Sequence, residues 1–98
     1  MIVVDAGNTR VKFAWMEIPP GGGVPKSLGF VAIPVGQPIP VKTLGDWIRK
    51  TSPTRIVVDG SNPPEVERVL RAWPGEGVRP TRLGDRRDFP LVIDVEFP

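Results

Sequence analysis

Short apolar runs separated by turn residues fill the first third of the chain, and this pattern predicts β-strands. Residues 2–4 are all apolar and β-branched and are followed by Asp5, which is typical of a buried strand. Residues 11–16 alternate between the two faces of a second strand: Val11, Phe13 and Trp15 share one face, and Lys12, Ala14 and Met16 share the other.

A tight turn joins these two strands. Ala6-Gly7-Asn8 supplies it, because Gly and Asn both tolerate a positive φ, so we expect a hairpin. Residues 28–33 predict a third strand that ends at Pro34. The proline-rich connector from Pro34 to Pro40 has no place in a regular element.

The middle of the chain changes to helical spacing. Thr43 is the expected N-cap of a short helix over residues 43–50, with Asp46 at the capping-box position. The apolar positions of this helix are Leu44, Trp47 and Ile48. Ser52-Pro53 is expected to end it.

A strand and a second helix follow. Residues 55–59 have an unbroken apolar centre, which indicates a strand buried on both faces. Asn62 is the expected N-cap of the helix, with Pro63 at its first position and Glu65 completing the capping box. A single apolar stripe contains Val66, Val69, Leu70 and Trp73, and Pro74-Gly75 ends the helix. Residues 91–95 predict the last strand.

The resulting order is strand, strand, strand, helix, strand, helix, strand. Short loops make the first three strands antiparallel neighbours, and the two strand–helix–strand crossings require parallel strands. We therefore expect one α/β domain over residues 1–98, with a mixed five-stranded sheet of the ribonuclease-H-like layout. The same layout forms half of the actin-like ATPase and sugar-kinase architecture, in which two such domains clamp a nucleotide.

Composition restricts the chemistry that this domain can perform. The chain contains no Cys and no His, which excludes disulfides, thiolate nucleophiles, Ser-His-Asp arrangements and most zinc sites. Its net charge is only +2, so the charge balance predicts neither a nucleic-acid nor a membrane partner. No long apolar run and no signal peptide are evident, and a cytoplasmic location is the expectation.

Asp5-Ala6-Gly7-Asn8-Thr9 is the segment that suggests chemistry beyond the fold. Gly7 lets a phosphate approach the backbone, Asn8 and Thr9 add side-chain donors, and Asp5 can hold Mg²⁺. Lys12 lies on the polar face of the next strand and can reach the same phosphates. The alternative is a simple hairpin turn without function, for which Gly-Asn after Asp is also typical.

The same residues resemble a known family. Residues 2–15, Ile-Val-Val-Asp-Ala-Gly-Asn-Thr-Arg-Val-Lys-Phe-Ala-Trp, are similar to the start of type III pantothenate kinases. In that family an Asp-x-Gly-Asn-Thr motif forms the first phosphate loop, and many members have a Lys downstream. Residues 57–63 resemble the start of the family's second helix, and residues 89–98 resemble the stretch before its Gly-x-Asp-Arg motif. Only the first of these motifs is specific.

The resemblance implies ATP-dependent phosphorylation of pantothenate, the first step of coenzyme A synthesis. It implies Mg²⁺ at Asp5, and phosphate contacts from Gly7, Asn8, Thr9 and Lys12. It also implies a monovalent cation such as K⁺, and a homodimer. The Gly-x-Asp-Arg motif, the second phosphate loop with the catalytic carboxylate, and the adenosine-binding half have no counterpart in these residues. We therefore expect an N-terminal phosphate-binding fragment, without catalytic residues and inactive alone.

Weaker candidates remain beside this site. Asp59 is either an outer-sphere Mg²⁺ residue or a carboxylate at the start of a helix, and a nuclease would use Asp5 and Asp59 as metal ligands. The group Arg79, Arg82, Arg86 and Arg87, with Asp85 and Asp88 among its members, favours a solvated loop over a nucleic-acid patch. The three Trp residues, Trp15, Trp47 and Trp73, are expected in the core rather than at an interface.

Two other classes of function stay open. One is a non-catalytic module of the same fold that binds nucleotide or regulates a partner. The other is a structural fragment that associates through the face its missing half would cover. Magnesium-dependent ATP binding by residues 5–12 distinguishes the first class from the second.

Overall fold

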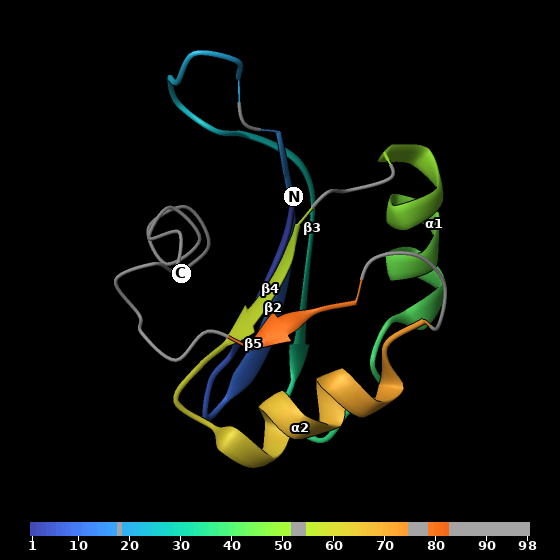
Figure 1. The fold of residues 1–98 in the computed structure, drawn as a ribbon. Coiled ribbons are helices and arrows are strands. Elements are labelled where there is room, and N and C mark those ends of the chain that lie inside the picture. Colours follow the sequence, from blue (N-terminus) through green and yellow to red (C-terminus); the bar gives the residue numbers. More distant parts are fainter. Residues whose placement is uncertain (18, 52–54, 75–78, 83–98) are drawn as a thin grey trace.

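Five strands and two helices make up the described part of the molecule (Figure 1). The structure is a computed structural model, and it describes residues 1–17, 19–51, 55–74 and 79–82. The elements in chain order are β1 (Ile2–Ala6), β2 (Arg10–Glu17), β3 (Lys26–Pro34), α1 (Val41–Thr51), β4 (Ile56–Asp59), α2 (Pro63–Ala72) and β5 (Thr81–Arg82).

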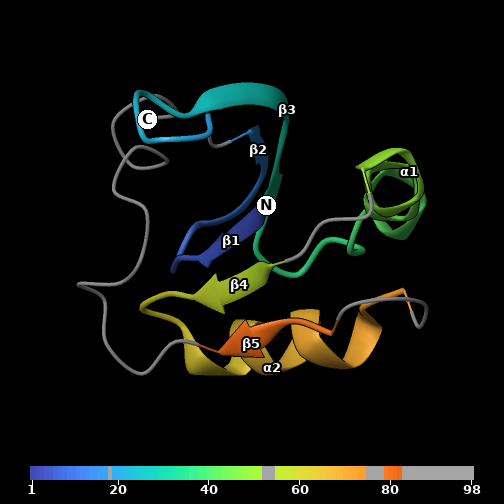
Figure 2. The same cartoon turned by 45° about the horizontal axis from the view of Figure 1, so that its top comes forward.

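The strands form one mixed sheet in the order β3-β2-β1-β4-β5, and Figure 2 shows them side by side. β1, β2 and β3 are antiparallel neighbours, whereas β4 pairs parallel with both β1 and β5. α2 makes the crossing from β4 to β5, because parallel strands need a connection that returns along the sheet. The expected α/β architecture is confirmed, and the strand order is consistent with a ribonuclease-H-like fold.

β1 lies at the centre of the sheet, and its sequence fits this position. Its apolar residues are buried on both faces: Ile2, Val4 and Ala6 on one, Val3 on the other. All four residues of β4 are buried, as expected for a strand covered on both sides. The two buried apolar runs of β1 and β4 therefore pair with each other inside the sheet.

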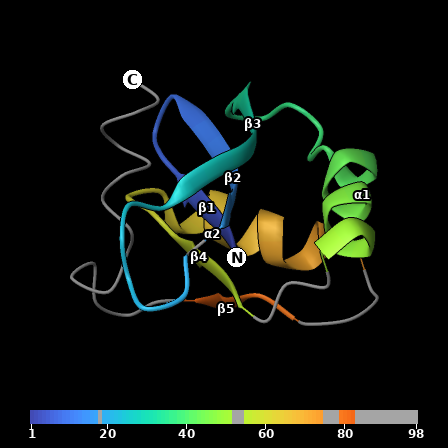
Figure 3. The ribbon, with the colours of Figure 1, turned by 90° about the horizontal axis from the view of Figure 1, so that it is seen from above.

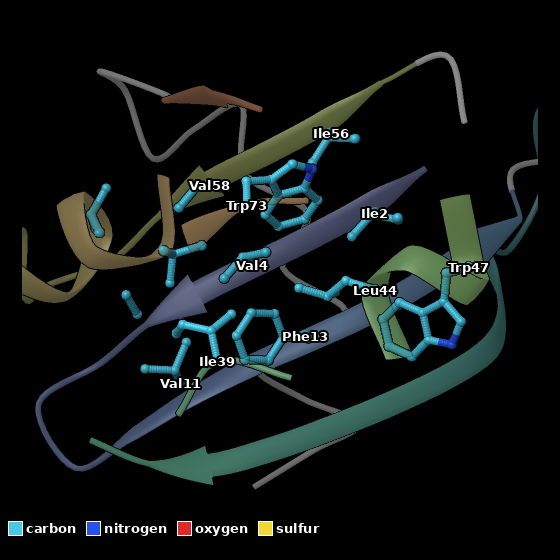
Figure 4. Packing of buried hydrophobic residues seen from close by; sticks show 13 residues of the cluster. Ile2, Val4, Val11, Phe13, Ile39, Leu44, Trp47, Ile56, Val58 and Trp73 are labelled. Atoms are coloured by element: carbon cyan, nitrogen blue, oxygen red, sulfur yellow. The ribbon is translucent and has the colours of Figure 1, made fainter. Parts of the chain in front are cut away.

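Both helices pack on the same face of the sheet, where the larger core cluster lies (Figures 3 and 4). α1 contributes Leu44 and Trp47, and α2 contributes Val66, Val69 and Trp73. The rings of Trp15 and Trp47 lie 6.0 Å apart between their centroids. Trp47 and Trp73 are 7% and 5% exposed, so the prediction that they are core residues is confirmed. Truncating a fully buried residue such as Leu44 to Ala costs about 2–5 kcal/mol in a core of this kind.

The opposite face carries a smaller cluster and the charged end of the sheet. Its buried members are Val3, Ala14, Met16 and Val57, with Met1 and Phe30 packed against them. The N-terminal ammonium of Met1 donates a hydrogen bond of 3.0 Å to the carbonyl of Met16. Burial lowers the pKa of this ammonium.

Several element boundaries differ from the sequence predictions, most clearly those of α1, β3 and the last strand. α1 begins at Val41, so Thr43 lies inside its first turn and is not the N-cap; Asp46 pairs with Arg49 instead of completing a capping box. β3 begins at Lys26, two residues before the predicted start. The strand beside β4 is Thr81–Arg82, within a stretch expected to be a loop, and Arg82 bonds Glu67 of α2 at 2.7 Å. The strand predicted at residues 91–95 lies outside the described residues.

The start of α2 agrees with the prediction in most respects. Asn62 caps the helix by accepting a hydrogen bond from the Glu65 N–H at 3.4 Å, and Pro63 is the first helical residue. The Glu65 side chain binds Arg68 at 2.8–2.9 Å and does not close the capping box. Within the described ranges, neither helix has the length and apolar content needed to span a bilayer.

Candidate functional site

A hollow of about 380 Å³ lies at the end of β1, beside the turn into β2. Its lining residues are Asp5, Gly7, Thr9, Arg10 and Lys12. They come from one continuous hairpin, so the site depends on the pairing of β1 with β2 and on the turn between them. Four of the five residues expected at a phosphate site are therefore brought together.

Strand register places two charged residues of this hollow, Asp5 and Lys12, on the same face of the sheet as Asp59. Asp5 lies opposite Lys12 of β2 and opposite Asp59 of β4. Because successive side chains of a strand alternate between faces, these three lie on the face away from the helices, together with Val3 and Val57. A cation and two carboxylates thus lie side by side across three adjacent strands.

The turn itself differs from the expected conformation. Gly7 does not adopt a positive φ. Its N–H donates to the carbonyl of Arg10 at 2.9 Å, and a Cβ at Gly7 would lie 3.1 Å from that oxygen. A side chain at Gly7 would therefore be tight against this carbonyl, and glycine favours the close approach of the two backbone segments. Because its N–H is used within the turn, Gly7 does not offer this donor to a ligand; the lining residues with side-chain donors are Thr9, Arg10 and Lys12.

Two residues change the predicted site. Asn8 is exposed and does not line the hollow, so its assignment as a phosphate contact has no support from this geometry. Arg10 lines the hollow and was missed from the sequence. The alternation that places Lys12 on the polar face also places Arg10 there, two residues earlier, and this signal was sufficient to find it.

The donor set suits an anion with a bound divalent cation. Arg and Lys side chains form charge-assisted hydrogen bonds with phosphate oxygens, and Thr9 adds a hydroxyl. Among the described residues no group of three or more potential metal ligands occurs. Mg²⁺ fits such a site, because it keeps several waters and takes one or two carboxylates plus phosphate oxygens.

The remaining candidates separate into different environments. Asp59 is 9% exposed at the end of β4; α2 starts at Pro63, and the acidic residue of its first turn is Glu65. Asp59 is therefore not the carboxylate of a helix start. Arg79 and Arg82 are exposed, and Arg82 is paired with Glu67, which agrees with a solvated segment. Residues 85–88 lie outside the described part.

Comparison with known proteins gives no family for this chain: no protein-family model matches it, and no curated protein matches it either.

Proposed function

We propose that this chain binds the phosphates of Mg²⁺-ATP and is the N-terminal phosphate-binding part of a kinase similar to type III pantothenate kinases. The observation that carries the proposal is the hollow at the first hairpin, lined by one carboxylate, two cations and a hydroxyl. In this proposal Lys12 and Arg10 neutralise the phosphates, Thr9 donates a hydrogen bond, and Asp5 holds the cation.

The proposed chemistry needs very little of the protein beyond position and charge. Phosphoryl transfer is catalysed mainly by placing the reactants and neutralising the charge that develops on the phosphate oxygens. The bound Mg²⁺ supplies neutralising charge between phosphate groups. Asp5 is fixed in a central strand, and Lys12 is its register partner, so both groups are held by the sheet rather than by a flexible loop.

The acceptor and the cellular setting follow from the resemblance. Pantothenate is the proposed acceptor for the whole kinase, with K⁺ as a second cation, a homodimer as the working form and the cytoplasm as its location. Transfer itself is assigned to segments beyond these residues, so the described site binds nucleotide and does not complete the reaction. A non-catalytic nucleotide-binding module of the same fold is the second candidate, and the same hollow supports it equally.

Nucleotide titration tests the binding part of the proposal. We expect Mg²⁺-ATP to shift the backbone amide resonances of residues 5–12. The Lys12→Ala variant should bind about tenfold or more weakly, because charge-assisted hydrogen bonds contribute about 1.5–3 kcal/mol. The Asp5→Ala variant should lose the dependence on Mg²⁺.

Lys42→Ala is the matched control, because Lys42 is an exposed cation on α1 far from the hairpin in sequence. This variant should bind Mg²⁺-ATP as the parent chain does. Equal affinities for the parent, Lys12→Ala and Asp5→Ala chains would refute the proposed site.

Sequencing of the gene tests the kinase part of the proposal. Sequence read beyond the codon for Pro98 should encode a Gly-x-Asp-Arg motif and a second Asp-x-Gly-Thr loop in the same frame. A stop codon at that point would remove the kinase proposal and leave the nucleotide-binding module.

A further inference from the structure

Hydrogen bonds connect the turn between β1 and β2 to segments that are distant in sequence. The backbone N–H of Asn62 donates to the carbonyl of Ala6 at 3.1 Å, and the Asn62 side-chain Nδ2 donates to the carbonyl of Gly7 at 3.2 Å. On the other side, the N–H of Val35 donates to the carbonyl of Thr9 at 3.0 Å. Three carbonyl groups at the turn thus accept hydrogen bonds from the scaffold, here Val35 after β3 and Asn62 before α2.

These bonds matter for an anion site because carbonyl oxygens repel phosphate. An oxygen that accepts a hydrogen bond from the scaffold is fixed in direction and cannot rotate with the chain toward a ligand. The turn is then left with its cationic and hydroxyl side chains in the hollow. The hydrogen bonds to these three carbonyl groups therefore help to determine both the shape of the hollow and its positive electrostatic character.

Asn62 is suited to this because its amide has two different ends. Oδ1 accepts from the N–H of Glu65 and caps α2, while Nδ2 donates to Gly7. One side chain consequently joins the first turn of a helix to the hairpin 55 residues earlier. Figure 1 shows this turn beside the start of α2. A Ser or Asp at this position would cap the helix, but an Asp carboxylate has no donor and a Ser side chain is one bond shorter, so neither replaces the Nδ2 hydrogen bond to the hairpin.

Gly60 allows the backbone before Asn62 to pass close to the end of β1, which the contact between Asn62 and Gly7 requires. A Cβ at Gly60 would lie 2.1 Å from the carbonyl oxygen of Ala6, so only glycine lets the two segments approach this closely. The approach carries the chain past Ala6 and brings Asn62 within reach of Gly7.

We propose that Asn62 is a positioning residue that holds the β1–β2 turn in its anion-binding geometry through its bond to the Gly7 carbonyl. The inference rests on the proposed function for the identity of the ligand, and on the hydrogen bonds alone for the geometry of the turn.

The test compares Asn62→Ser with Asn62→Ala. Both variants lose the Nδ2 donor to Gly7, but the shorter Ser side chain still caps α2, so the thermal midpoint of Asn62→Ser should stay close to that of the parent. In Asn62→Ser without ligand, hydrogen exchange of the Gly7 amide should be about three- to tenfold faster, which corresponds to one lost hydrogen bond. Amides at the centre of β1 should keep their exchange rates.

Binding of Mg²⁺-ATP gives the second readout. Asn62→Ser should bind about three- to tenfold more weakly than the parent, whereas Ser61→Ala, one residue earlier, should bind as the parent does. An Asn62→Ser chain with parental Gly7 exchange and parental affinity would overturn the inference. If the parent itself does not bind Mg²⁺-ATP, the proposed function is wrong, and the Gly7 exchange rate still decides the role of Asn62.

Discussion

Gly60 occupies a position where the chain has room for a hydrogen atom only. Its φ is +150°, and an added Cβ would lie 2.1 Å from the Ala6 carbonyl oxygen and 2.6 Å from its carbon. These are backbone atoms of a central strand, which cannot move aside. We predict that Gly60→Ala lowers the free energy of unfolding by about 3 kcal/mol or more, measured by urea denaturation with tryptophan fluorescence.

Gly22 offers the matched control for that measurement. Its φ is also positive, at +95°, but nothing lies within 4 Å of an added Cβ. Gly22→Ala therefore carries the backbone strain without the collision and should cost about 1–2 kcal/mol. Similar losses for the two variants would show that the contact between Gly60 and Ala6 is not a close one.

The contacts of single residues explain why the site could be predicted only in part. Asp5, Gly7, Thr9 and Lys12 are neighbours in sequence, so one hairpin pattern was enough to bring them together. The approach of Gly60 to Ala6 depends on the parallel pairing of β1 with β4, which local sequence does not encode. Gly7 was expected to use its conformational freedom in the turn, but it does not adopt a positive φ, and its missing side chain leaves room for the Arg10 carbonyl.

Glu65, in the first turn of α2, interacts with Arg68 of the same helix and with the backbone of Gly36. The hydrogen bonds from Arg68 hold the pKa of the Glu65 carboxyl below its ordinary value, and a backbone hydrogen bond from Gly36 acts in the same direction. The folded state therefore favours the ionised carboxylate more than the unfolded state does. This contribution is complete above the unfolded pKa and is lost as pH falls through the folded pKa.

Measuring the free energy of unfolding over a series of pH values tests this contribution of Glu65. Glu65→Gln should lower the free energy of unfolding by about 1–3 kcal/mol at neutral pH, and its difference from the parent should shrink as the solution is acidified. Asp46→Asn is the control, since its pair with Arg49 is exposed and should contribute little at any pH. A difference that persists unchanged below the folded pKa would exclude this role for the Glu65 charge.

The two helices show which start signals can be read from sequence. α2 begins with Asn62-Pro63, where both residues have local reasons to start a helix, and this start was predicted correctly. α1 begins at Val41, a β-branched residue with no capping side chain before it, where the Leu44 N–H bonds the Pro40 carbonyl. β5 is two exposed polar residues whose extended form depends on pairing with β4, so no periodicity could reveal it.

At the scale of the whole molecule, the two faces of the sheet differ in the side chains that they carry. The face under α1 and α2 carries the larger apolar cluster, and the other face carries Asp5, Lys12 and Asp59 in one row. The apolar pattern of the chain was enough to predict the first four strands and the helix-covered core, but not β5. The row of charges follows from strand register, which appears only when β1, β2 and β4 are assembled.

This row predicts a conflict between stability and cation binding. Asp5 and Asp59 are register partners on adjacent parallel strands, about 4.8 Å apart between their Cα atoms, and Asp59 is 9% exposed. Two like charges at such positions destabilise a sheet by about 0.2–1 kcal/mol, and a bound divalent cation relieves the repulsion. Asp59→Asn should therefore unfold at a higher temperature than the parent without Mg²⁺ and gain less from added Mg²⁺. Glu17→Gln, which removes an exposed charge at the far end of β2, should leave the response to Mg²⁺ unchanged. If Asp59→Asn is less stable without Mg²⁺ and gains as much from it as the parent, the two carboxylates do not share a cation.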